Sequence, residues 1–458
     1  MSFDRTLEPQ PGAIRPFHFP ATRRTVLGNG LTTLVAARTA LPVVTLRMTV
    51  AAGAAGECTG EEGLATLAAN ALEGGTQRLA GETLAWELER LGLQLETWTT
   101  WDALSLNCTA VAAQLPAALA LLAEIVRAPA FPESEVGRMR GEQLAELLQR
   151  QVEPRALADD MAAHFFFSDA SPYSRPLLGR RTALETLDAT TVRDFHQRRF
   201  TPGAAALILS GDVDPDAAVA LVARSFGDWT GSAPDRPDVP AEPRCRELNL
   251  QLVDRPGAVQ SELRIGHVSV ARSHPDYFSL LVMNAILGGA FTSRLNLSLR
   301  ERHGFTYGVR SGFSFRRSPG PFLIQTAVGT EVTVRAIEET LREVEQLLGA
   351  GPTDAEVASA RDYLAGIFPL ELQTTEQLAA KLAELVVHDL PDDYFEHYRS
   401  RILAVTPADV LRVARAHVRP GDLTIVVVGE ADTLEPELTA AGLAPVVRHS
   451  AETAAALS

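Results

Sequence analysis

Apolar and polar positions divide the start of the chain into strands followed by helices. Residues 31–37 and 43–51 are rich in β-branched side chains and are separated by a Leu-Pro pair, a pattern typical of two strands joined by a turn. Residues 59–72 carry alanine and leucine on one helical face, and residues 83–91 form a second helical segment that stops at Gly92. The pattern therefore predicts two strands followed by two helices.

The following segment repeats this order. Residues 93–111 alternate apolar and polar side chains, which predicts a further strand pair, and residues 115–127 and 133–151 predict two more helices. Strands and helices thus occur in runs, without the strict alternation that is typical of a parallel sheet. The pattern favours an α+β fold in which an antiparallel-rich sheet is backed by helices.

The sequence also contains two halves that are similar to each other. Residues 192–213 and 410–431 both predict a helix, a Pro-Gly turn and an apolar strand ending in glycine, at a constant offset of 218. Residues 135–140 match residues 356–361 at an offset of 221, and a Gly-Gly pair recurs at an offset of 214. Three matches in the same order predict a duplication.

A segment between the two halves has a different composition. Residues 227–246 are rich in proline and charge and lack apolar periodicity, which is typical of a semi-stiff linker. We therefore expect an N-terminal domain over residues 20–230, a linker over residues 231–245 and a C-terminal domain of similar architecture over residues 246–440.

Composition excludes several classes of protein. The formal net charge of −15 argues against general nucleic-acid binding, which needs a basic surface to displace counterions from phosphates. Three cysteines are too few for a disulfide framework or a cysteine zinc site. The first twenty residues lack the apolar core of a secretory signal, and no apolar run approaches the roughly 18 residues of a membrane span. A soluble cytoplasmic protein, bound to neither membrane nor nucleic acid, is expected.

Five short motifs, in order over most of the chain, resemble the insulinase/pitrilysin family of metallopeptidases, which includes the mitochondrial processing peptidases. They are L-G-N-G-L at residues 27–31, L-E-G-G-T at 72–76, the S-R-L to Tyr segment at 293–307, L-P-D-D-Y-F at 390–395 and V-T-P-A-D-V at 405–410. None is decisive alone, but their order and the duplication together carry the resemblance. It implies two homologous α+β halves that face each other like a clamshell.

The zinc motif of the resembled family is missing. In that family an H-x-x-E-H helix precedes the Gly-Gly-Thr; its histidines bind zinc and its glutamate activates water. Here the ligand positions fall on Thr66 and Asn70, and the general-base position falls on Ala69. Glu146 stands near the place of the distal ligand and is interpreted as a solvated helix glutamate rather than a retained ligand. None of the ten histidines forms a helical i, i+4 pair, so we expect no metal in this chain.

A second element of the family site is retained. Arg300 is followed seven residues later by Tyr307, and in the resembled family an arginine and a tyrosine at this spacing close over the zinc site. A guanidinium and a phenol can hold a peptide carbonyl or carboxylate and stabilise oxyanion charge. Gly304 is expected to end the helix, so that Tyr307 enters the following strand. The alternative is that Arg300 lies on a solvated helix face and Tyr307 packs in a strand.

The resemblance implies a division of work between two subunits. The favoured hypothesis is a non-catalytic, substrate-binding subunit of a heterodimeric zinc metallopeptidase, inactive alone. Arg300 and Tyr307 would act in trans on the zinc site of a homologous partner that has an intact H-x-x-E-H helix. An unfolded peptide substrate would add as a strand near residues 94–107, which could equally be a purely structural strand pair.

Two other hypotheses remain. The first is a peptide-binding or scaffold protein of the same fold with no peptidase partner. It is less favoured, because a scaffold does not need Arg300 and Tyr307. The second is a hydrolase with unrelated chemistry, which is the least favoured because the sequence contains no G-x-S-x-G, P-loop or G-x-G-x-x-G motif.

Overall fold

Two six-stranded sheets form the framework of the protein. The computed structural model describes residues 12, 15–236 and 238–450. The first sheet has the order β1-β2-β6-β3-β5-β4. Its strands are β1 (Thr22–Val26), β2 (Thr32–Ala37), β3 (Val43–Val50), β4 (Glu96–Thr99), β5 (Leu104–Val111) and β6 (Ala205–Gly211).

The second sheet repeats the topology of the first except at one edge, where β1 pairs antiparallel with β2 but β12 pairs parallel with β7. Its order is β12-β7-β11-β8-β10-β9. In both sheets a central parallel pair, β2 with β6 and β7 with β11, is followed by three antiparallel pairs. The strands are β7 (Asn249–Asp254), β8 (Gln260–Val268), β9 (Val309–Phe313), β10 (Pro321–Gly329), β11 (Thr424–Gly429) and β12 (Val446–His449). The predicted antiparallel-rich fold with two homologous halves is confirmed.

The predicted helices of the N-terminal half are present, and three further helices over residues 154–166, 181–184 and 215–226 were not predicted. The predicted helix 59–72 begins only at Leu64, because Gly63 adopts a left-handed conformation with φ 97°. The helices are α1 (Leu64–Ala71), α2 (Gly81–Arg90), α3 (Leu115–Arg127), α4 (Glu133–Val152), α5 (Pro154–Phe166), α6 (Arg181–Leu184), α7 (Ala189–Arg199) and α8 (Pro215–Phe226).

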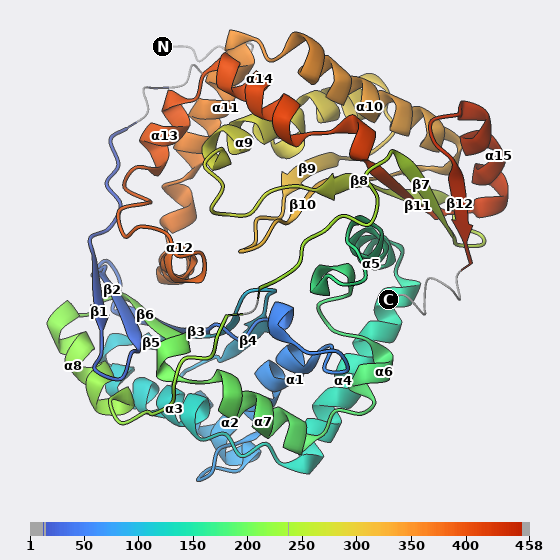
Figure 1. The fold of residues 1–458 in the computed structure, drawn as a ribbon. Coiled ribbons are helices and arrows are strands. Elements are labelled where there is room, and N and C mark those ends of the chain that lie inside the picture. Colours follow the sequence, from blue (N-terminus) through green and yellow to red (C-terminus); the bar gives the residue numbers. More distant parts are fainter. Residues whose placement is uncertain (1–11, 13–14, 237, 451–458) are drawn as a thin grey trace, which may run out of the picture.

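The helices of the C-terminal half mostly lie on the outer side of the second sheet, away from the other half (Figure 1). They are α9 (Tyr277–Asn284), α10 (Thr333–Ala350), α11 (Asp354–Ile367), α12 (Thr375–Val387), α13 (Tyr398–Ala404), α14 (Pro407–His417) and α15 (Ala431–Ala441). Among the helices of the described residues, none has both the length and the apolar composition that crossing a bilayer requires.

One helix of each half packs against the sheet of the other half. Helix α12 of the C-terminal half packs on β3 and β6, whereas α5 of the N-terminal half packs on β8 and β11. Both helices lie between the two sheets, which face each other (Figure 1). Leu34 and Ile208 of the first sheet share one buried cluster with Leu382 of α12. The halves are therefore joined by a continuous apolar core.

The segment that joins the halves has little regular structure. Between α8 and β7, the described residues form no helix and no strand of more than one residue. A single bridge pairs Pro243 with Phe167, and Val239 is buried among apolar side chains from both halves. The expected linker therefore lies against the body of the protein.

Candidate functional site

The positions of the missing zinc motif lie on α1. Thr66 is half-buried and its hydroxyl donates to the Leu177 carbonyl at 3.3 Å, while Ala69 is completely buried. Asn70 is half-buried one residue further on. A hydroxyl, a methyl group and an amide form a poor set of donors for zinc, and Ala69 offers no base to activate water.

The start of α1 is fixed by a buried ion pair. The Glu57 carboxylate accepts hydrogen bonds from the backbone N–H groups of Ala65 (2.7 Å) and Gly63 (3.2 Å). Arg175 Nη2 lies 2.8 Å from Glu57 Oε2, and both side chains are almost fully buried. Burial raises the pKa of Glu57 to about 7, although Arg175 and the backbone donors act in the opposite direction. These contacts anchor the degenerate helix.

Glu146 is exposed on α4, which packs against α1. Buried Gln143 on the same helix instead holds the residue before α1, because its amide donates to the carbonyls of Gly63 (3.0 Å) and Leu178 (2.7 Å). Within the described residues, the only group of three close histidine, cysteine or acidic side chains is formed by His274, Asp276 and His417, and it lies in the C-terminal half. It is therefore not a replacement for the site on α1.

Arg300 lies in the helical segment Asn296–Arg302 and is half-buried. Its guanidinium carbon is 4.3 Å from the ring centroid of Phe291, whose own side chain is exposed. Arg300 Nε is 3.6 Å from the Glu301 carboxylate. Gly304, with φ 64°, follows the end of the helix as expected.

Tyr307 does not enter the next strand, so this detail of the expectation is wrong. Thr306 and Gly308 form a tight turn, in which the Thr306 hydroxyl donates to the Gly308 carbonyl and accepts from the Gly308 N–H. The strand β9 begins only at Val309. Tyr307 is 97% exposed at this turn, and no hydrogen bond or ring contact joins it to Arg300. It borders a cleft of about 450 Å³ that β8, β9 and β10 also line.

The strand expected to accept a peptide lies at a sheet edge. β4 is the last strand of the first sheet and pairs with β5 on one side only. Beside it is a second cleft of about 310 Å³, lined by Arg47, Trp98, Arg316 and residues of α12. The sequence analysis did not identify Arg47 or Arg316. A usable signal existed for Arg47, which is the only charged residue in an otherwise mostly apolar strand.

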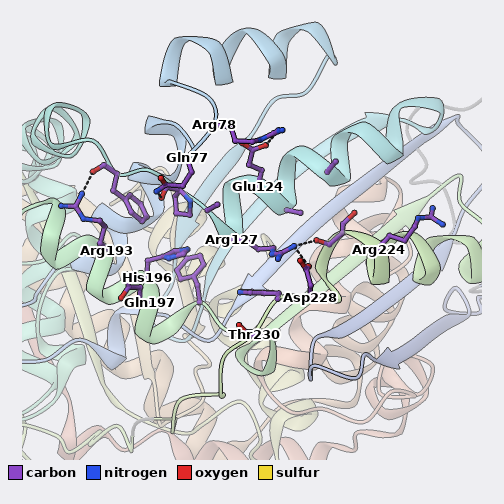
Figure 2. Close-up of a pocket in the computed structure, with 18 residues that line it drawn as sticks. Gln77, Arg78, Glu124, Arg127, Arg193, His196, Gln197, Arg224, Asp228 and Thr230 are labelled. Atoms are coloured by element: carbon purple, nitrogen blue, oxygen red, sulfur yellow. Dashed lines mark hydrogen bonds and ion pairs between the residues drawn. The ribbon is translucent and has the colours of Figure 1, made fainter.

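A cavity of about 910 Å³ lies among α3, α7, α8 and the segment after α8 (Figure 2). Arg127 on α3 pairs with Asp228 at 2.8 Å, and Arg78 pairs with Glu124 across its rim (Figure 2). The cavity shares no residue with the zinc-helix positions, with the Arg300–Tyr307 segment or with β4. It therefore does not contribute to the site expected from the sequence.

Comparison with known proteins supports the resemblance. Residues 33–179 match the family model for Insulinase (Peptidase family M16), and residues 186–364 match the one for the Peptidase M16 inactive domain. An uncharacterized zinc protease of Mycobacterium tuberculosis is 27% identical over 86% of this chain and 90% of its own. A probable mitochondrial-processing peptidase subunit beta of Schizosaccharomyces pombe is 25% identical over 93% of this chain and 96% of its own. A non-peptidase homolog of Helicobacter pylori, YmxG, is 23% identical over 80% of this chain and 84% of its own.

Solved structures show the same fold. A crystal structure of a peptidase M16 inactive domain from Pseudomonas fluorescens superposes with a TM-score of 0.84 at 24% identity, over 89% of this chain and 98% of the other. A protease from Helicobacter pylori gives a TM-score of 0.82 at 19% identity, over 89% and 99%. Together, the two matched family regions, the shared fold and the degenerate helix α1 show that the chain belongs to the insulinase (M16) peptidase family and lacks that family's H-x-x-E-H motif.

Proposed function

We propose that this chain is the non-catalytic, substrate-binding subunit of a heterodimeric zinc metallopeptidase. The first support is chemical. Thr66, Ala69 and Asn70 offer neither a zinc ligand set nor a general base, so peptide hydrolysis needs a zinc site on another chain. That partner would be a homologue with an intact H-x-x-E-H helix, and the zinc would be bound there.

The observation that carries the proposal is the exposure of Tyr307. Tyr307 is 97% exposed, and Phe291, whose ring contacts Arg300, is 68% exposed, so both leave apolar surface in contact with water. Such surfaces are typical of interaction sites. In the proposed complex Arg300 and Tyr307 face the partner's zinc site and hold the peptide carbonyl or the developing oxyanion.

Two relatives support a division of work between chains. One is named as a subunit of a processing peptidase and another as a non-peptidase homolog, and both match most of this chain. In the proposed complex an unfolded peptide pairs with the free edge of β4, where main-chain hydrogen bonds supply affinity independent of sequence.

Substitution of the two residues in the reconstituted complex tests the proposal. The chain is mixed with an H-x-x-E-H homologue from the same genome, and cleavage of an unstructured fluorogenic peptide is measured. Arg300→Ala and Tyr307→Phe are each expected to lower kcat by about 10²-fold or more. Arg302→Ala serves as the matched control, because Arg302 is 65% exposed on the same helical segment and has only 4.0 Å contacts with acidic partners.

Two outcomes would contradict the proposal. A kcat that neither substitution changes would show that Arg300 and Tyr307 take no part in the reaction. A stable complex that never gains activity over the homologue alone would favour the scaffold hypothesis instead.

A further inference from the structure

The cleft of about 310 Å³ beside β4 contains two arginines that have neither a hydrogen-bond acceptor nor an ion partner among the described side chains. It is bounded by β3 and β4, by the turn that follows β4, by residues 314–316 after β9 and by α12, so both halves contribute to it. Within the described part of the chain, the guanidinium groups of Arg47 and Arg316 make no hydrogen bond and no ion pair. Nε of Arg47, and Nε and Nη1 of Arg316, are buried without any acceptor.

Aromatic rings hold these two cations in place. The guanidinium carbon of Arg47 is 4.5 Å from the ring centroid of Trp98 on β4. That of Arg316 is 4.2 Å from the ring of Tyr173 and 4.9 Å from that of Trp101. Ring faces attract a cation but offer no lone pair to a buried N–H group, so the hydrogen-bonding capacity of both groups is unused.

The acidic side chains in and beside the cleft form no ion pair with either arginine among the described residues. Asp102 accepts a hydrogen bond from the backbone N–H of Arg317 at 3.0 Å. Glu384 pairs with Lys381 at 3.1 Å and lies 3.8 Å from Arg272. Glu96 on β4 and Arg47 on β3 both pair with Asn107 of β5, which lies between them. The Glu96 side chain is exposed and forms no ion pair with Arg47.

The remaining titratable side chain that lines the cleft is His388. Burial lowers its pKa to about 4, so it is neutral at pH 7. Its Nδ1 is buried without a partner. The two arginines can only donate hydrogen bonds, so the unmet need in the cleft is for hydrogen-bond acceptors, and a negatively charged group would supply them.

The energetics of the two arginines agree with this conclusion. Burial is the main cause that lowers the pKa of Arg47 and lowers that of Arg316 to about 10, whereas the charges of Glu384 and Glu96 on Arg47, and of Asp102 on Arg316, act in the opposite direction. Both groups stay charged at neutral pH while partly deprived of water. A buried cation without a partner is costly, and a carboxylate that accepts from both sides of the cleft would offset this cost.

We propose that this cleft binds a carboxylate carried by a peptide that lies along the free edge of β4. The proposal rests on the proposed function and adds to it the chemical class of the peptide group that is recognised. Glu96 and Trp98 are two residues apart and so lie on one face of β4. A peptide strand paired with β4 would direct every second side chain to that face, toward Arg47 and Arg316.

Two sources of the carboxylate are distinguished by the peptides used. Each peptide is a fluorescein-labelled, unstructured 15-mer, and its binding to the full chain is measured by anisotropy. The first has one internal glutamate and an amidated C-terminus. The second has glutamine at that position and a free C-terminus, and the third has glutamine and an amide. A side-chain site favours the first peptide, and a C-terminal site favours the second, by about tenfold over the third.

Substitution of the two arginines tests whether the preference for a carboxylate arises in this cleft. Arg47→Gln and Arg316→Gln are expected to remove the preference while the third peptide still binds with its original Kd. Arg224→Gln is the matched control, because Arg224 is exposed on α8 and has no ion partner among the described residues. If Arg316→Gln disturbs folding, because Arg316 packs among aromatic rings, the Arg47→Gln variant alone decides the test.

Three results would overturn this proposal. They are equal affinities for all three peptides, a preference that survives Arg47→Gln, and no measurable binding of any peptide. None of these results touches the trans role of Arg300 and Tyr307, which is measured separately as cleavage by the reconstituted complex.

Discussion

The hydroxyl of Thr45 on β3 donates a hydrogen bond to the hydroxyl of Thr375 on α12, at 2.7 Å, in the buried contact between the two halves. Thr109 on β5 donates to Glu376 of the same helix at 2.5 Å. Helix α12 of the C-terminal half thus covers one face of the first sheet, and α5 of the N-terminal half covers one face of the second sheet. The two halves therefore share one buried cluster, although the N-terminal half also has a cluster of its own.

Truncation of one leucine on α12 is therefore expected to weaken both halves. Leu382 is completely buried, so Leu382→Ala should lower the free energy of unfolding by about 2–5 kcal/mol. Hydrogen exchange should show faster exchange in β3 and β6 together with β8 and β11. Leu370→Ala is the control, because Leu370 is 56% exposed. Faster exchange confined to the first sheet would show that the halves are independent.

Loss of the ion pair at the start of α1 is expected to be costly. Glu57→Gln leaves Arg175 buried without its counter-charge, so the free energy of unfolding at pH 8 should fall by about 3–5 kcal/mol. Arg181→Gln breaks an exposed i, i+4 pair with Glu185 and should change it by about 0.5 kcal/mol or less. Chemical denaturation measures both variants, and equal effects would contradict the structural role given to Glu57.

Acid is expected to destabilise the protein through His267. Its Nε2 accepts from the Arg419 N–H at 3.1 Å and its Nδ1 donates to the Val268 carbonyl, an arrangement that only the neutral ring allows. Burial is the main cause that lowers the pKa of His267 to about 4, from 6.5. Between these values the unfolded chain binds a proton that the folded chain does not, so the free energy of unfolding falls as the pH is lowered.

The pH profile of a variant measures this contribution. His267→Gln should reduce the slope of unfolding free energy against pH by up to about 1.4 kcal/mol per unit between pH 6.5 and 4. Exposed His397 provides the control substitution to glutamine, which should leave the slope unchanged. A variant at position 267 with the slope of the original protein would show that this histidine is protonated in the folded state.

Most of the fold could be predicted because local patterns and the architecture agree. The helix expected over residues 115–127 is α3, with the same bounds, and the strand expected over 43–51 is β3, one residue shorter. The Pro-Gly turns that revealed the duplication precede β6 and β11, which occupy equivalent places in the two sheets. Such signals lie within a few residues of one another and survive in a single sequence.

The arrangement between the halves could not be predicted. Nothing in the sequence of α12 indicates that its apolar face covers β3 and β6 rather than its own sheet. The grouping of Arg47 with Arg316 has the same origin, since it joins a strand of one half to a loop of the other. The position of Tyr307 was missed for a local reason, because the Thr306 hydroxyl forms a turn that delays the next strand.

The central claim is that peptide bonds are broken by a zinc ion on another chain. The most direct test measures zinc by mass spectrometry, and peptide cleavage, for this chain alone, for the H-x-x-E-H homologue alone and for their complex. We expect zinc only where the homologue is present, no cleavage by this chain alone and the highest activity in the complex. Stoichiometric zinc bound at Thr66 and Asn70, or cleavage by this chain alone that a chelator abolishes, would contradict the account.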